Sequence, residues 1–120
     1  VEAFGVRPPR LDLPARVLSG GNQQRFIAGR ELSRRPPLLV AVHPTRGVDL
    51  GAIAFLHERL LEERDRGTAI LLVSADLTEL RALSDRILIL YRGKIAYDAT
   101  RETIDAPRLH RALLGLEVQA

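Results

Sequence analysis

The chain has 120 residues, of which 46% are hydrophobic and 28% are charged, and its formal net charge is +3. This composition fits one small folded domain with a modest core and excludes a disordered chain. The 18 basic residues are interspersed with 15 acidic ones, and three phenylalanines and two tyrosines are the only aromatic side chains. A nucleic-acid surface normally shows clustered positive charge or stacking aromatics, so we expect no nucleic-acid partner.

The residue types also limit the chemistry and the location of the chain. It contains no cysteine, so neither disulfides nor thiolate metal sites are available. It has no apolar run of the ~20 residues that a membrane helix needs, and no signal-peptide pattern. The chain starts at Val1 and contains no methionine, which favours a fragment of a longer protein. We therefore expect a soluble, cytoplasmic fragment.

The first 17 residues contain three prolines. The Pro8-Pro9 pair excludes a helix at that point and predicts an extended connection. We expect this connection to be anchored by its apolar side chains, Leu11, Leu13 and Val17.

The rest of the chain alternates between helical and strand patterns. Two continuous apolar runs, 38–42 and 68–74, predict buried strands of a parallel sheet. Two more strands, 86–91 and 94–97, flank Arg92-Gly93, which is a hairpin signal. Helices are expected over about 20–33, 51–65, 76–83 and 107–114. This order predicts an α/β fold with a mostly parallel sheet and an antiparallel edge hairpin.

The stretch that carries the most chemistry is Leu18-Ser19-Gly20-Gly21-Asn22-Gln23-Gln24-Arg25. Ser19 favours a helix N-cap, and the two glycines allow the backbone to approach a neighbour closely. A serine hydroxyl, exposed glycine amides and a positive helix end together suit an anion such as phosphate. A serine followed by glycines more often marks an ordinary capped surface helix, so the anion site needs further support.

The full octet resembles the signature motif of ATP-binding cassette (ABC) ATPases, usually written LSGGQ. The form LSGGNQQ looks like the second cassette of tandem-cassette sugar and nucleoside importers. Later stretches also match the family in order: Pro44-Thr45, Arg46-Gly47-Val48-Asp49, Ser74-Ala75-Asp76 and Tyr91-Arg92-Gly93-Lys94-Ile95. In that family the signature closes over the γ-phosphate of ATP held by the partner cassette. The resemblance therefore implies that Ser19, Gly20, Gly21 and Asn22 contact ATP in trans.

The resemblance also implies a fold, namely the C-terminal part of a P-loop NTPase cassette, incomplete at its N-terminal side. Residues 1–33 would be the end of the helical subdomain with the signature motif. Residues 34–98 would form the second half of the core sheet, and residues 99–120 a C-terminal helix and tail.

Three positions depart from the family pattern. Val42 stands where the family has the magnesium-ordering aspartate, His43 where it has the catalytic glutamate, and Ala75 where it has the switch histidine. An imidazole can act as a base, but a missing magnesium ligand beside it favours a substitution with no catalytic role. We therefore expect no intact catalytic residue and no metal site. The phosphate loop GxxxxGK[ST] is absent from the sequence, so we expect the fragment alone to bind neither ATP nor Mg²⁺.

Gly47 and Asp49 lie in a stretch that resembles the family's D-loop, which crosses the interface between cassettes. A turn explains Gly47 without reference to a partner, and an Asx turn or a helix N-cap explains Asp49 in the same way. For Asp49 the structural and interface roles are compatible, because an N-cap aspartate can lie at an interface.

The resemblance implies a function for the whole protein. It would be the ATP-hydrolysing subunit of an importer for nucleosides or simple sugars, using ATP and Mg²⁺. It would work with a partner cassette, in the same polypeptide or a second copy, and with permease subunits at the inner face of the cell membrane. One alternative is a catalytically dead cassette that acts only in assembly, and another is a basic nucleic-acid module. Bare sheet edges lead us to expect that the fragment self-associates.

Overall fold

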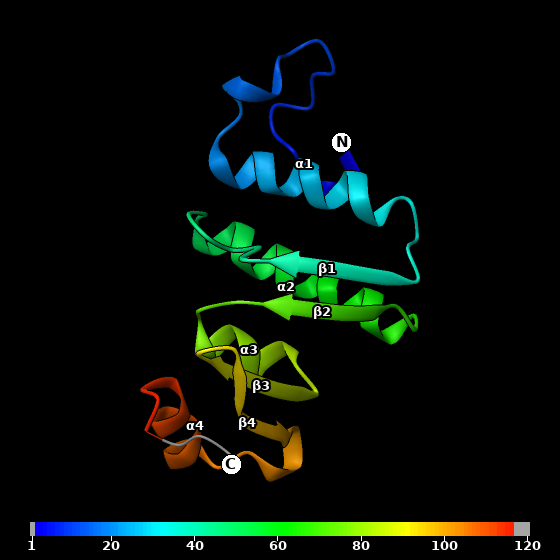
Figure 1. Ribbon diagram of the computed structural model, residues 1–120. Helices are drawn as coiled ribbons and strands as arrows, with labels where there is room; N and C mark the ends of the chain where they lie inside the picture. The colour runs from blue at the N-terminus through cyan, green and yellow to red at the C-terminus, as the bar shows by residue number, and fades with distance from the viewer. Residues whose placement is uncertain (1, 117–120) are drawn as a thin grey trace. The chain divides into compact units, whose positions relative to one another are not determined.

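The computed structural model describes residues 2–116, which form two compact units divided between Ala75 and Asp76 (Figure 1). Four helices and four strands alternate in the predicted order: α1 Gly20–Leu32, β1 Leu38–Val42, α2 Leu50–Asp65, β2 Ala69–Val73, α3 Leu77–Leu83, β3 Arg86–Tyr91, β4 Lys94–Thr100 and α4 Ala106–Leu113. The α/β prediction is therefore confirmed. Over the described range, no helix has the length and apolar character needed to cross a membrane.

The first unit is built around a parallel pair of strands. β1 and β2 run in register from Leu38 opposite Ala69 to Val42 opposite Val73, and α2 is the crossover between them. Parallel neighbours need such a crossover, because a tight turn reverses the direction of the chain and so joins antiparallel strands. α2 contributes three buried apolar side chains, Ala52, Leu56 and Leu60, which recur at helical spacing.

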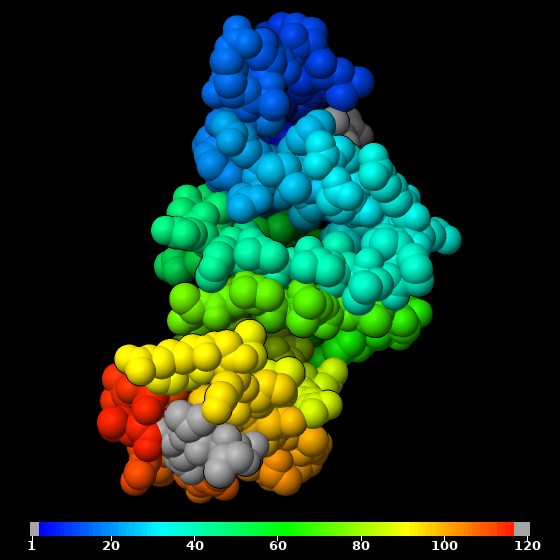
Figure 2. Space-filling model, viewed as in Figure 1, coloured from blue at the N-terminus to red at the C-terminus, as the bar shows by residue number. Residues whose placement is uncertain are grey.

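One face of this sheet is exposed, which corrects the prediction that both strands are buried. Along each strand, half-buried residues alternate with exposed ones. The exposed apolar side chains are 43–59% accessible: Leu38, Val40 and Val42 on β1, and Leu71 and Val73 on β2. Figure 2 shows atoms of both strands at the molecular surface in this view. Continuous apolar runs are typical of strands covered on both faces, but these five side chains lack such cover.

The segment before α1 contains short 3₁₀ turns, at Glu2–Phe4 and Ala15–Val17, and is not simply extended. The anchoring residues predicted there are also wrong in part, because Leu11 is 85% and Val17 59% exposed. The anchors lie before the prolines instead. Val6 is buried, and the Phe4 ring fills the space beside Gly29, where an added Cβ would come within 2.9 Å of it.

The second unit is a hairpin covered by a helix. β3 and β4 pair antiparallel, and Arg92 and Gly93 both have positive φ, as a tight two-residue hairpin turn requires. The hairpin prediction is confirmed, although β4 continues to Thr100. The described strands form two two-stranded sheets, one parallel and one antiparallel.

The core of this unit lies between the hairpin and α4. Its side chains are at most 8% exposed: Ile87, Ile89, Ala96, Tyr97, Ala99, Leu109 and Ala112. The Tyr97 hydroxyl accepts a hydrogen bond from the Asp105 amide at 2.8 Å, which ties β4 to the N-terminus of α4. On the outer face the Arg86 guanidinium is hydrogen-bonded to Asp98 and holds the pKa of that carboxyl below its usual value.

The exposed apolar face of β1 and β2 predicts that the chain self-associates in solution, because such patches are removed from water by contact. We expect light scattering at high concentration to show dimers or larger assemblies. A Val40→Thr, Leu71→Thr variant changes two register partners to polar residues and has a β-branched residue, which suits a strand, at both positions, so it should be more nearly monomeric. The matched control is Leu11→Thr, at an exposed position outside the sheet, which should leave assembly unchanged. A clean monomer for the unaltered chain would contradict this prediction.

Candidate functional site at the signature loop

The site begins at residues 18–22 of the signature octet, here called the signature loop. Within it, Ser19 is the N-cap of α1. Its Oγ accepts hydrogen bonds from the Asn22 amide N–H at 3.4 Å and from Asn22 Nδ2 at 3.0 Å. The N-cap prediction is confirmed. A hydroxyl oxygen has two acceptor lone pairs and one proton to donate. Both acceptor positions are used within the helix start, so the proton of this exposed hydroxyl is the part of Ser19 that can still form a hydrogen bond.

The first turn of α1 offers further donors. The amides of Gly20 and Gly21 occupy the first two helical positions, where an α-helix provides no acceptor of its own. Gly20 is exposed, whereas Gly21 is buried. The positive end of the helix dipole adds to these donors, so the geometry suits an anion.

The Asn22 side chain stabilises this loop by hydrogen bonds within the chain. Its Oδ1 accepts a hydrogen bond from the Arg7 backbone N–H at 2.9 Å, while its Nδ2 donates to Ser19. The side chain therefore connects the segment before the prolines to the helix start. Both ends of the Asn22 amide are engaged within the chain, which makes it a support for Ser19.

Gly21 lies against the carboxylate of Asp49. A Cβ added at Gly21 would be 2.7 Å from Asp49 Oδ2 and 3.1 Å from the Ala52 Cβ. These distances are shorter than side-chain carbon contacts allow, so only glycine fits here without a shift of its neighbours. The neighbouring Gly20 is less tightly packed, because its added Cβ would lie 3.4 Å from the Gly47 carbonyl oxygen.

The loop on the other side of this contact is 43–49, here called the Asp49 loop. Gly47 has φ +73°, a left-handed conformation that favours glycine and confirms the predicted turn. Asp49 is the N-cap of α2, with Oδ1 accepting from the Ala52 amide at 3.0 Å. The structure thus brings together all the residues predicted for the signature and the D-loop: Ser19, Gly20, Gly21, Asn22, Gly47 and Asp49.

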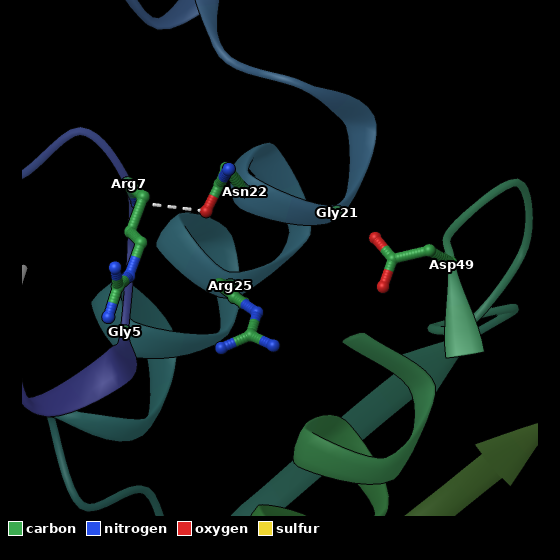
Figure 3. Close-up of a pocket in the computed structure, with 6 residues that line it drawn as sticks. All are labelled: Gly5, Arg7, Gly21, Asn22, Arg25 and Asp49. Atoms are coloured by element: carbon green, nitrogen blue, oxygen red, sulfur yellow. Dashed lines mark hydrogen bonds between the residues drawn. The ribbon is translucent and has the colours of Figure 1, made fainter. Parts of the chain in front are cut away.

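An open pocket of about 220 Å³ lies where the two loops meet, lined by Gly5, Arg7, Gly21, Asn22, Arg25 and Asp49 (Figure 3). Sequence reasoning missed three of these residues. Arg25 could have been found, because a residue four positions after Gly21 lies on the same side of a helix. Nothing in the sequence marks Gly5 or Arg7, which reach the pocket through the fold of the N-terminal segment.

The three substituted positions, Val42, His43 and Ala75, lie at or just after the ends of β1 and β2. Val42 is the last residue of β1 and lies opposite Val73, and Ala75 comes two residues after β2. His43 has φ +47°, and its amide donates to the Val73 carbonyl at 2.8 Å. Histidine tolerates this left-handed conformation better than most residues do, so His43 has a conformational role that needs no catalysis.

Proteins of similar sequence are transport ATP-binding proteins. The chain is 49% identical over 117 residues to the glucose import ATP-binding protein TsgD13 of Haloferax volcanii, covering 96% of this chain and 21% of that protein. It is 52% identical over 95 residues to the guanosine import ATP-binding protein NupO of Bacillus subtilis, covering 79% of this chain and 19% of that protein. No family model matches the chain.

Solved structures of similar fold are ATP-binding subunits or cassettes of ABC transporters. The ATP-binding subunit of an ABC transporter superposes with a TM-score of 0.71 at 27% identity, over 92% of this chain and 44% of that one. The chain belongs to the ABC family. The dimeric ABC cassette MJ0796 also superposes, with a TM-score of 0.65 at 26% identity, over 72% of this chain and 38% of that one. The ABC resemblance of the signature octet is therefore confirmed, and the present ABC chain spans about a fifth of the length of its curated relatives.

The contact between Gly21 and Asp49 leads to a stability prediction for this ABC chain. Gly21→Ala should destabilise the first unit by about 1–3 kcal/mol, because overpacking at a rigid contact costs that much. The matched control is Gly20→Ala, where an added Cβ makes an ordinary contact and alanine favours helix. Urea unfolding of the two variants measures the difference. Equal stability of the two variants would show that the contact can relax.

Proposed function

We propose that this chain is part of the ATP-hydrolysing subunit of an importer for nucleosides or simple sugars, and that its signature loop closes on ATP bound by a partner cassette. The observation that carries the proposal is the start of α1, where Ser19 has a hydrogen to donate and the first amides lack helical acceptors. The names of the similar proteins, which import guanosine, nucleosides and glucose, support the substrate class.

The chemistry of such a site is stabilisation of charge. ATP with its magnesium ion, held by the partner, would supply the phosphoryl group that is transferred. The Ser19 hydroxyl and the Gly20 amide would donate hydrogen bonds to its γ-phosphate oxygens, and the helix dipole would favour the negative charge. These donors are fixed before ATP arrives, because Asn22 holds Ser19 and the Gly21 contact fixes the backbone. Preorganised donors of this kind stabilise a transition state without further rearrangement.

The chain's own nucleotide site would not be competent. The side chain of Val42 has no oxygen for a magnesium ion, which requires oxygen ligands. Ala75 has no polar atom in its side chain for a γ-phosphate. His43 keeps the backbone connection to β2 but lacks the carboxylate of the family pattern. The chain would therefore serve the partner's site.

The partners follow from this role. A second cassette must present the ATP, and the dimeric solved relative supports such pairing. Import also requires permease subunits that cross the membrane, so we place the chain at the inner face of the cell membrane.

A second candidate is a cassette that only holds the assembly together. The substitutions at Val42, His43 and Ala75 favour it, because they remove local chemistry. The two candidates differ in whether Ser19 matters for ATP hydrolysis.

The test is steady-state ATP hydrolysis by the full-length protein reconstituted with its permease. Ser19→Ala should lower the rate by on the order of 10²–10³, the usual loss for one preorganised donor. The matched control is Ser33→Ala, at the opposite end of the same helix, which should keep the wild-type rate. Restoring Val42→Asp and His43→Glu should change little, because a unit with other parts missing is not repaired by two of them. Wild-type activity of Ser19→Ala would favour the assembly-only candidate.

A further inference from the structure

Phe55, in the second turn of α2, lies in a cluster of charged and aromatic side chains. The Arg25 guanidinium lies over its ring at 4.4 Å from the centroid, and the Arg59 guanidinium lies at 5.2 Å. The Phe4 ring meets it edge to face, with centroids 6.2 Å apart. All four side chains are half-buried, so water screens these contacts only in part.

Arg25 depends on this ring more than Arg59 does. Arg59 forms an ion pair with Glu62 at 2.7 Å. Arg25 forms a hydrogen bond of 3.3 Å from Nη2 to the Gly51 carbonyl, and no ion pair of Arg25 is found among the side chains of residues 3–116. A guanidinium over an aromatic face is attracted by the ring's quadrupole, so Phe55 is an electrostatic partner of Arg25.

Arg25 thereby connects the two loops of the site. It extends from α1, six residues after Ser19, and contacts the first turn of α2, two residues after Asp49. Gly5 leaves room for the guanidinium, because an added Cβ there would lie 2.8 Å from Arg25 Nη1. The side chain lines the pocket between the signature loop and the Asp49 loop (Figure 3).

We propose that Phe55 is a positioning residue that holds Arg25 across α1 and α2, so that the signature loop and the Asp49 loop are presented to the partner as one rigid surface. The proposal rests on the proposed function, in which that surface closes on the partner's ATP. Phe55 itself touches no ATP. By holding Arg25, Phe55 raises the fraction of time in which the donors at Ser19 and Gly20 are correctly placed.

The experiment uses the reconstituted full-length protein and measures kcat and KM for ATP hydrolysis. Phe55→Leu keeps an apolar side chain but removes the ring face, and should lower kcat roughly three- to tenfold, the range expected for a half-buried cation–π contact. KM for ATP should change less than twofold, because the partner cassette holds the nucleotide. Phe55→Tyr keeps the ring and should restore kcat to near the wild-type value.

A double-mutant comparison separates positioning from a general loss of stability. Arg25→Gln removes the cation, and in that background Phe55→Leu should cause no further fall in kcat, because its effect passes through Arg25. Arg92→Gln removes a comparable cation–π contact over Tyr91 in the second unit and serves as the control that keeps wild-type activity.

Three results would overturn the proposal: wild-type kcat for Phe55→Leu, failure of Phe55→Tyr to restore kcat, or additive losses in the Arg25→Gln background. Ser19→Ala in the same assay shows which idea has failed. If Ser19→Ala is impaired and Phe55→Leu is not, the positioning role alone is wrong. If Ser19→Ala retains the full rate, the proposed function is wrong as well.

Discussion

The first unit of this chain depends on the close approach of the Gly21 backbone to the Asp49 carboxylate. No other residue type fits at position 21 without moving Asp49 or Ala52. This contact sets the starts of α1 and α2 beside each other, and the two starts are capped differently. Asp49 brings a negative charge to the start of α2, whereas Ser19 caps α1 with a neutral hydroxyl. In the proposed function, the start of α1 is therefore the one that meets an anion from outside, through the Ser19 hydroxyl and the Gly20 amide.

Local features of the chain could be predicted from the sequence, because they depend on a few neighbouring residues. Ser19 caps a helix, Gly47 adopts positive φ, and Arg92-Gly93 closes a hairpin. Each outcome follows from the conformational freedom or hydrogen-bonding capacity of the residue itself.

Features set by distant parts of the chain could not be predicted. The apolar runs of β1 and β2 indicate strands covered on both faces, but pattern alone does not say how much cover the chain supplies. The anchoring of the N-terminal segment by Val6 and Phe4, and the arrival of Arg7 at Asn22, depend on where the chain turns. The domain boundaries expected from the family resemblance, at residues 33 and 98, stay a prediction; the compact units divide at Ala75 instead.

The proposed function, in which this chain acts on ATP bound by a partner cassette, explains a contrast within the first unit. Many contacts fix the residues around Ser19, whereas the ends of β1 and β2 lack the polar side chains of the family pattern. Around Ser19, the hydrogen bonds of Asn22, the Gly21 contact and the Arg25–Phe55 pair all restrict the loop. At the ends of β1 and β2, Val42 and Ala75 offer no polar side-chain atoms, and His43 is hydrogen-bonded through its backbone to Val73 and Arg46. A chain that contacts ATP bound by a partner cassette needs the fixed loop at Ser19, but it does not need a nucleotide site of its own at the ends of β1 and β2.

The most direct test of this account is to measure how accessible position 19 is to a chemical label in the full-length protein. The chain contains no cysteine, so Ser19→Cys introduces a single thiol within it, and any cysteines elsewhere in the protein are to be replaced first. The account predicts that a maleimide labels this thiol rapidly without nucleotide or with ADP, and slowly when ATP is held in its pre-hydrolysis state, because the partner's γ-phosphate then covers position 19. Equal labelling rates in all nucleotide states would contradict the claim that this signature loop closes on ATP.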